Sequence, residues 1–326
     1  MTGPVAVAEI VRSGFVEGHH YGSVLALAAD GSPAYVAGEV ELQILPRSCN
    51  KPLQAYGMLR AGLRLEPQLL ALACASHSGE DFQVDGVRRI LADAGLDEDR
   101  LQTPPDYPLA DPVRDKLLRA GGGPAPVLMN CSGKHAAMLA SCVHNGWPTE
   151  TYLDPVHPLQ RAIAEAFSAM TGEPVAHIAV DGCGAPLLST SLTGLARAFS
   201  RLARGLGGDD RPDEHAAQIS RAIREFPEHV SGTSREESRL LRALPGAIGK
   251  AGAEGCYAVA LADGRAFTLK VDDGAGRARP VVMAALLERT GADRGHGVDT
   301  GAVRRTGRAR LRGGGMDVGE IRAVLP

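Results

Sequence analysis

A serine and a lysine three residues apart, Ser48 and Lys51, form the pattern of a self-activated nucleophile. If a helix begins here, positions i and i+3 share one face, so the Lys51 amine can take the proton of the Ser48 hydroxyl, provided that burial keeps the amine uncharged. Pro52 supports a helix start, because proline is tolerated in a helix's first turn. Ser-x-x-Lys also occurs on many solvated helix faces, so the surrounding sequence must support a catalytic interpretation.

Three further short polar segments that contain glycine interrupt an otherwise apolar, helical sequence. They are Cys74-Ala-Ser-His-Ser-Gly-Glu80, Asn130-Cys-Ser-Gly-Lys-His135 and Asp181-Gly-Cys-Gly184. Small polar residues beside glycine let backbone N–H groups approach a ligand closely. Each segment alone could be a turn or a helix cap. Together with the Ser48 segment and a stretch at Lys250, they suit one site assembled from distant loops.

Composition favours a globular protein that has neither a polyanionic nor a membrane partner. The 326 residues carry 35 Lys and Arg against 38 Asp and Glu, a net charge of −3, and 44% are apolar. No run approaches the roughly 20 apolar residues that cross a bilayer, and no secretion signal opens the chain, so we expect a soluble, cytoplasmic protein. Its six scattered cysteines indicate free thiols or metal ligands rather than a disulfide framework. Five arginines between 304 and 312 read as a solvated tail or a subunit contact, and we expect no nucleic-acid site.

The elements that must position these residues follow an α+β pattern. Strand signals cluster near both ends, at 5–11, in a hairpin over 23–37 and in a second hairpin over 257–270. Helical periodicity occupies the middle, with a short strand at 176–180 and a last helix near 281–290. The segment 97–126, rich in Pro, Gly and charge, is expected to be an irregular excursion or a lid. The pattern predicts an antiparallel sheet built from the two termini and a helical region between them.

Five motifs, in this order, resemble those of the asparaginase II family, the rhizobial-type class 3 L-asparaginases. They are Pro46-Arg-Ser-x-x-Lys-Pro-x-Gln54, Cys74-Ala-Ser-His-Ser-Gly-Glu80, Asn130-Cys-Ser-Gly-Lys-His135, Asp181-Gly-Cys183 and Lys250-x-Gly-Ala-Glu-Gly255. The resemblance implies hydrolysis of L-asparagine to L-aspartate and ammonia. It also implies a fold similar to serine β-lactamases and glutaminases, as a single catalytic domain over 1–326 and as a homodimer.

The resemblance also implies roles for four residues. Ser48 would be the nucleophile with Lys51 as its partner, and Ser76 and Lys250 would form a second Ser-Lys pair beside them. Amide hydrolysis needs a nucleophile, a base, an acid for the leaving ammonia and donors for the oxyanion. Two lysines at close range would keep at least one of them neutral, and Ser76 could carry the proton between groups.

The same family pattern implies one zinc ion per chain, held by Cys131, Lys134 and Cys183. The two cysteines are plausible thiolate ligands, but a lysine must bind deprotonated and is an unusual third ligand. Ligand habit alone would prefer the neighbouring His135, so the choice between Lys134 and His135 stays open. Two buried structural thiols without metal are the alternative.

Substrate recognition requires a cation for the α-carboxylate and an anion for the α-ammonium. Arg47 and Asp181 are the candidates, although Arg47 could be a surface cation and Asp181 a turn cap. His77, His135 and the Gly133 backbone are expected to contact the substrate. The sequence departs from the family pattern over 230–238 and at Cys49 and Asn50, positions at which a change could alter the contacts to the substrate.

Two other functional classes fit part of the sequence. One is another Ser-Lys amidohydrolase or a β-lactamase or penicillin-binding-like acyl hydrolase, which lacks support because no Lys-Thr-Gly follows the second serine. The other is a zinc-stabilised binding protein without activity. The intact set of two serines and two lysines argues against that second class.

Overall fold

The main sheet joins the two ends of the chain. The structure, a computed structural model, describes residues 3–326. Eight antiparallel strands follow the order β6-β7-β8-β2-β1-β10-β9, and β3 pairs with β2. The strands of this sheet are β1 Val5–Arg12, β2 Phe15–Leu27, β3 Pro33–Ala37, β6 Ile248–Ala251, β7 Cys256–Ala260, β8 Ala266–Val271, β9 Ala309–Gly313 and β10 Met316–Ala323. A second, small sheet pairs β4 Ile178–Val180 with β5 Pro186–Leu188.

The expected α+β class is confirmed, because strands from both termini share one antiparallel sheet. Strand β1 lies between β2 and β10, with Ile10 opposite Ile321. Both predicted hairpins are present. In the second, Leu261 N–H donates to Arg265 at 2.8 Å, and Gly264 takes a φ of +98° that favours glycine at this tight turn.

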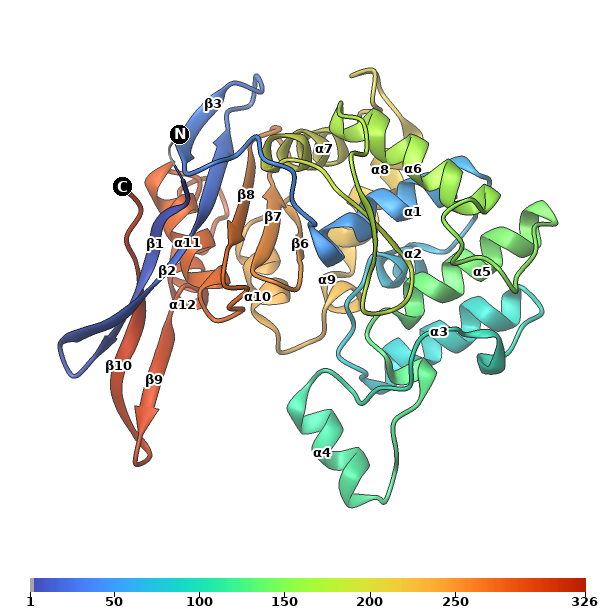
Figure 1. The fold of residues 1–326 in the computed structure, drawn as a ribbon, viewed down its shortest axis with the longest axis horizontal. Helices are drawn as coiled ribbons and strands as arrows, with labels where there is room; N and C mark the ends of the chain where they lie inside the picture. The colour runs from blue at the N-terminus through green and yellow to red at the C-terminus, as the bar shows by residue number, and fades with distance from the viewer. Residues whose placement is uncertain (1–2) are drawn as a thin grey trace.

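Within residues 3–326, twelve helices complete the fold, some against the main sheet and others in a helical region to one side of it (Figure 1). Every residue of β7 is buried, so both faces of this strand must be covered, and α7 and α11 are the helices that contact it. The helices are α1 Lys51–Arg60, α2 Pro67–Ala73, α3 Asp81–Asp93, α4 Asp111–Arg119, α5 Ser132–Asn145, α6 Pro158–Thr171, α7 Leu192–Arg204, α8 Glu214–Glu225, α9 Pro227–Val230, α10 Glu236–Ala243, α11 Arg279–Arg289 and α12 Thr300–Thr306. Three short 3₁₀ helices are η1 Arg47–Asn50, η2 Glu98–Arg100 and η3 Pro126–Leu128.

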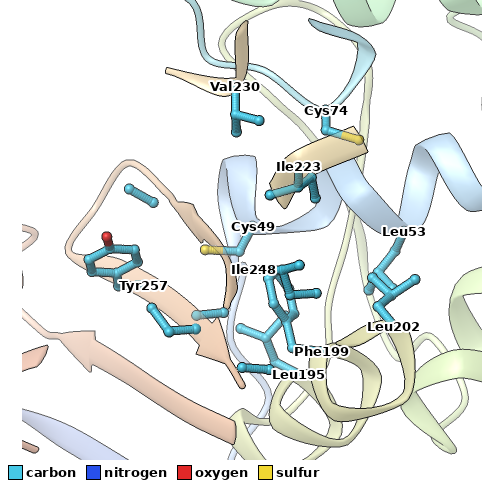
Figure 2. Close-up of a cluster of buried hydrophobic side chains, with 14 of the residues drawn as sticks. Cys49, Leu53, Cys74, Leu195, Phe199, Leu202, Ile223, Val230, Ile248 and Tyr257 are labelled. Atoms are coloured by element: carbon cyan, nitrogen blue, oxygen red, sulfur yellow. The ribbon is translucent and has the colours of Figure 1, made fainter. Parts of the chain in front are cut away.

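Helix α1 is enclosed by the helical region and is thereby fixed in place. All of its residues except Arg60 are buried, and it packs against α5, α6 and α8. At Gly57 a Cβ atom would lie 2.8 Å from the Ile163 backbone, so glycine permits the close approach of α6. Figure 2 shows the apolar cluster beside the start of α1, where Cys49 and Leu53 lie near side chains of α7, α8 and β6. This packing holds the first turn of α1 rigidly, which a catalytic residue there requires.

Two stretches differ from the prediction. The expected irregular excursion over 97–126 contains α4, which has no buried residue and projects from the rest of the molecule (Figure 1). The arginines expected in a solvated tail or a subunit contact are exposed, but the segment is not a tail. Arg304 and Arg305 lie on α12, and Arg310 and Arg312 lie on β9, which pairs with β10 at the edge of the sheet. No helix within residues 3–326 combines the length and the apolar content that a bilayer crossing needs.

Candidate active site

Ser48 lies in the short helix η1, directly before α1. Pro52 occupies the first turn of α1, as predicted, and Ser48 is partly exposed whereas Lys51 is 1% exposed. Arg47, the residue before the serine, has a φ of +51°, which is uncommon for a residue with a side chain. Such backbone conformations persist where the surrounding structure imposes them and cluster at functional sites. The nucleophile candidate therefore lies on a rigid and unusually shaped turn.

The Lys51 amine binds Ser76 rather than Ser48. Its Nζ donates to Ser76 Oγ at 3.0 Å and to the Ala75 carbonyl at 2.5 Å, and within residues 3–326 no hydrogen bond joins it to Ser48 Oγ. A neutral amine has two hydrogens, which these two acceptors can take, and one lone pair that is left for a third group. Ser48 is three residues before Lys51, a spacing that places both side chains on one face of a helical turn, so its hydroxyl is the candidate for that lone pair.

Ser76 is held by the segment that follows α9. Its N–H donates to the Val230 carbonyl at 3.0 Å, and its own carbonyl accepts from the Arg235 guanidinium at 3.2 Å. The side chain of Ser76 is 7% exposed. The stretch 230–238, where the sequence departs from the family pattern, therefore lies directly against the candidate site.

Lys250 lies in β6 and is fully buried. The predicted pairing with Ser76 is not what the structure shows, because Lys250 Nζ donates to Glu237 Oε1 at 3.0 Å and to the Ala251 carbonyl at 2.8 Å. A buried amine gains more from a carboxylate than from a neutral hydroxyl, which explains the difference. Burial lowers the pKa of Lys250, the Glu237 carboxylate opposes that change, and the charge of Lys51 adds to it. The two lysines thus lie near enough to influence each other.

The two residues inside the Ser-x-x-Lys segment serve packing. Cys49 Sγ donates to the Lys250 carbonyl at 3.0 Å, and Asn50 Nδ2 donates to the Leu188 carbonyl at 2.9 Å. Both side chains are buried. These contacts tie η1 to β6 and β5. The two residues that depart from the family pattern, Cys49 and Asn50, therefore help to fix the position of η1.

The two residues predicted to bind a zwitterion lie side by side. Arg47 Nε donates to Asp181 Oδ1 at 2.7 Å, and a second, longer contact joins Arg47 to the exposed Glu254 at 3.5 Å. Arg47 is 23% and Asp181 11% exposed. Their charges therefore face each other at the edge of the site, where a ligand with one cationic and one anionic group could meet both.

His77 and Gly133 lie nearby, but contacts within the protein account for both. His77 Nδ1 accepts from the Gly79 N–H at 3.1 Å, so its Nε2 carries the proton and donates to Ser132 Oγ at 2.7 Å. Burial lowers the pKa of His77 to about 3, which keeps the ring neutral. A Cβ atom at Gly133 would lie 2.6 Å from the Leu72 carbonyl, so glycine lets α5 approach α2.

The three predicted zinc ligands meet beside this site. Lys134 Nζ donates to Cys183 Sγ at 3.1 Å, and the Cys131 thiol is buried in the same small apolar cluster as Cys183. The hydrogen bond from Cys131 and the nearby Lys134 charge lower the pKa of Cys183, so a thiolate is favoured there. His135 Nδ1 contacts the Tyr152 hydroxyl at 2.7 Å, and its buried Nε2 has no hydrogen-bond partner within residues 3–326.

The side chains present are of the kinds that can hold zinc. Cys131 and Cys183 offer two sulfurs, Lys134 contacts Cys183, and the buried His135 Nε2 has no hydrogen-bond partner within residues 3–326. Within the same residues no group of three or more His, Cys, Asp or Glu side chains is placed to hold a metal ion.

Glu237 is the site residue that the sequence analysis missed. It is fully buried against Lys250, yet it stands in a stretch of alternating charges that resembles a solvated helix surface. The departure from the family pattern over 230–238 was the one available signal.

A model of the L-asparaginase II family matches residues 8–323, nearly the whole chain. None of the curated proteins matches. Similar solved structures include a β-lactamase from Mycobacterium bovis, at 14% identity over 82% of this chain and 94% of that one, with a TM-score of 0.48. Another is a Bacillus glutaminase, at 11% identity over 82% of this chain and 90% of that one, with a TM-score of 0.45.

Proposed function

Because the chain belongs to the L-asparaginase II family, we propose that it is an amidohydrolase whose substrate is L-asparagine, which it converts to L-aspartate and ammonia. One observation carries the proposal. The buried Lys51 amine lies on the same turn as Ser48 and contacts Ser76, which comes from a distant segment. A second buried lysine, Lys250, lies beside it. Such an arrangement supplies a nucleophile, a base and a proton carrier, which amide hydrolysis requires.

In the proposed reaction Ser48 Oγ attacks the side-chain amide carbon while its proton passes to Lys51 Nζ. Lys51 returns a proton to Ser76 Oγ as Ser76 gives its own to the amide nitrogen, so the C–N bond breaks and ammonia leaves. Water then attacks the Ser48 ester, and its proton follows the same route back to Ser48 Oγ. The 3.0 Å contact between Lys51 and Ser76 is within the range for such transfers.

The substrate's own charges would engage the existing ion pair. The Arg47 guanidinium would receive the α-carboxylate, and Asp181 would receive the α-ammonium. A glutamine side chain is one methylene longer, so it would displace the amide carbon from Ser48 if the α-groups were held in the same place. We therefore expect a preference for asparagine, of about 10- to 200-fold, as one methylene typically allows.

A zinc ion, if bound, would be held by Cys131, Lys134 and Cys183, where it would supply a fixed positive charge that orders the start of α5. Metal analysis of the purified protein should then give near one zinc per chain, and a Cys131→Ala, Cys183→Ala double variant should lose it. A double variant that retains full zinc would contradict this placement. We also propose a homodimer, which sedimentation at several concentrations would test.

Ammonia release is the direct test of the proposed function. The protein is assayed with L-asparagine, L-glutamine and the β-lactam nitrocefin, and activity is expected with asparagine above all. Lys51→Met removes the base while it keeps an unbranched apolar side chain in the buried position, so turnover should fall by a factor of about 10² to 10⁴ with the fold intact. A Lys51→Met protein with the wild-type rate would refute the assignment.

A further inference from the structure

Glu237 and Lys250 form an ion pair that is fully enclosed by protein. Both side chains are 0% exposed, and their Nζ and Oε1 atoms lie 3.0 Å apart. Oε1 also accepts from the Ala251 N–H at 2.9 Å, whereas Oε2 is buried and has no partner within the described residues 3–326. Glu237 is thereby fixed to β6 at two points, and it holds the Lys250 amine in one direction.

A buried ion pair such as this one costs folding free energy, so its presence suggests a role other than stability. Removing two charges from water costs several kcal/mol for each ion, and well-packed apolar side chains of similar volume often serve stability as well or better. The pair lies beside Lys51, which the proposed reaction uses as its base. Its value is therefore better sought in the charge it places next to that base than in stability.

The surroundings of Lys250 contain several groups that sense its charge. They are Glu237 of α10, Lys51 of α1, Arg235 before α10, Cys49 of η1, Cys74 after α2 and, facing Glu237, Tyr257 of β7. Glu237 is the only carboxylate among these groups. Without it, burial and the charge of Arg235 would act together to lower the pKa of Lys250.

We infer that Glu237 is a positioning residue for the proposed hydrolysis, because its carboxylate fixes Lys250 as an ammonium beside the turn that carries Ser48 and Lys51. This inference rests on the proposed function. Lys51 is then the base for the reaction, and Lys250 is a fixed cation rather than the base for Ser76. Lys250 and Glu237 neither gain nor lose a proton during turnover, since the proton of Ser48 travels through Lys51 and Ser76.

The variant Glu237→Gln tests this division of roles, because it keeps the shape of the side chain and removes its charge. The pH dependence of kcat should have two limbs, of which the alkaline one reports Lys250. In Glu237→Gln the alkaline limb should move to lower pH by at least about one unit, because the ammonium loses its counterion. In the same variant kcat at the optimum should fall at least about 10-fold, and KM should change less than about threefold.

Two further variants separate this role from a structural one. Glu236→Gln is the matched control, because Glu236 is on the same helix turn but pairs with Arg279 at 2.6 Å. It should leave both limbs in place. Glu237→Asp keeps the carboxylate at a shorter reach, so it should lower kcat while its alkaline limb stays within about half a unit of wild type. The same limbs in Glu237→Gln and wild type, or equal displacement of the limb in Glu237→Asp, would overturn the inference.

Two different experimental outcomes separate this inference from the proposed function on which it rests. A wild-type protein that releases no ammonia from asparagine would defeat the proposed function itself, whereas an active wild type with an unmoved Glu237→Gln profile would defeat only the role of Glu237. If Glu237→Gln does not fold, the Glu237→Asp profile decides. In addition, a Glu237→Gln, Lys250→Met double variant should regain stability relative to Glu237→Gln alone, because no buried charge is left unpaired.

Discussion

In the proposed reaction Ser76 passes the proton from Lys51 to the nitrogen that leaves as ammonia. Its hydroxyl accepts from Lys51, and its position beneath the 230–235 segment keeps it from solvent. In Ser76→Ala the proton has no side-chain route from Lys51 to the leaving nitrogen. We expect kcat to fall by a factor of about 10² to 10⁴ with KM nearly unchanged.

Ser78→Ala is the matched control for that prediction. Ser78 is also buried and two residues away, but its hydroxyl donates to the Ser231 carbonyl at 2.7 Å and does not contact Lys51. Its loss should lower the free energy of unfolding by about 1 kcal/mol and leave kcat within about threefold. Equal losses of kcat in the two variants would mean that Ser76 acts only through folding.

His77 gives the protein a pH-dependent stability that can be measured without any substrate. Burial lowers the pKa of its ring to about 3, whereas an unfolded histidine titrates near 6.5. Between these values the unfolded chain binds a proton that the folded chain does not, so stability falls as the pH falls. From pH 7 to pH 5 this residue alone should lower the free energy of unfolding by about 2 kcal/mol.

Urea denaturation of wild type and His77→Gln at both pH values checks this expectation. The variant is expected to be less stable at pH 7, because it loses buried hydrogen bonds, but its stability should change about 2 kcal/mol less between the two pH values. His19→Gln, at an exposed histidine, should behave as wild type. An unchanged difference in His77→Gln would show that the ring is protonated in the folded protein.

At the scale of single residues, motif spacing did not predict the hydrogen-bond partners of the candidate site residues. Lys51 contacts Ser76, whereas Lys250 contacts Glu237 rather than the predicted Ser76. Glu237 stands among charged neighbours, and only the packing of α10 onto β6 turns it inward. Motif spacing contains no information on which of two nearby acceptors a flexible lysine reaches.

At the scale of elements, the approach of α5 to α2 decides where the Asn130–His135 segment is placed. Alanine generally stabilises a helix interior relative to glycine by about 1 kcal/mol. At Gly133, however, the added Cβ would lie 2.6 Å from the rigid Leu72 carbonyl. Overpacking costs about 1 to 3 kcal/mol, so Gly133→Ala should lower rather than raise the free energy of unfolding.

Gly123→Ala controls for the substitution itself. Nothing lies within 4 Å of the Cβ that it would add, and its backbone φ is not in the left-handed region. Its effect on the free energy of unfolding should stay within about 0.5 kcal/mol. If Gly133→Ala proves more stable than wild type by thermal denaturation, α5 can move away from α2, and the close packing proposed for this segment is wrong.

The elements that the sequence analysis missed share a physical cause. In β9, half-buried and exposed positions alternate, and the exposed ones are Arg310 and Arg312. These charged residues made the strand look like a solvated segment in the sequence. Helix α10 carries its apolar residues on one face, but charged residues surround them. In both elements tertiary packing, rather than average composition, decides the structure.

At the scale of the whole molecule, the sheet can be completed only when the last strand joins the first. Glu9 of β1 is 8% exposed, and the Arg322 guanidinium of β10 contacts its carboxylate through two nitrogens. This contact ties residues 313 positions apart, so it helps to join the two ends of the chain. The strands that carry it are neighbours in the sheet, between β2 and β9.

Arg322→Ala should therefore destabilise the entire molecule rather than a local segment. The Glu9 carboxylate would keep its buried position without a partner, which typically costs about 1 to 3 kcal/mol, although the partly exposed arginine places the expectation near the lower value. Arg310→Ala is the control, because its contact with Glu320 spans 3.9 Å and both side chains are about half exposed. That variant should change the free energy of unfolding by less than about 0.5 kcal/mol.

Urea denaturation followed separately by circular dichroism and by the fluorescence of Trp147 should give one shared transition for Arg322→Ala. Two separate transitions would show that the helical region folds without the closed sheet, which would contradict a sheet and a helical region that unfold together.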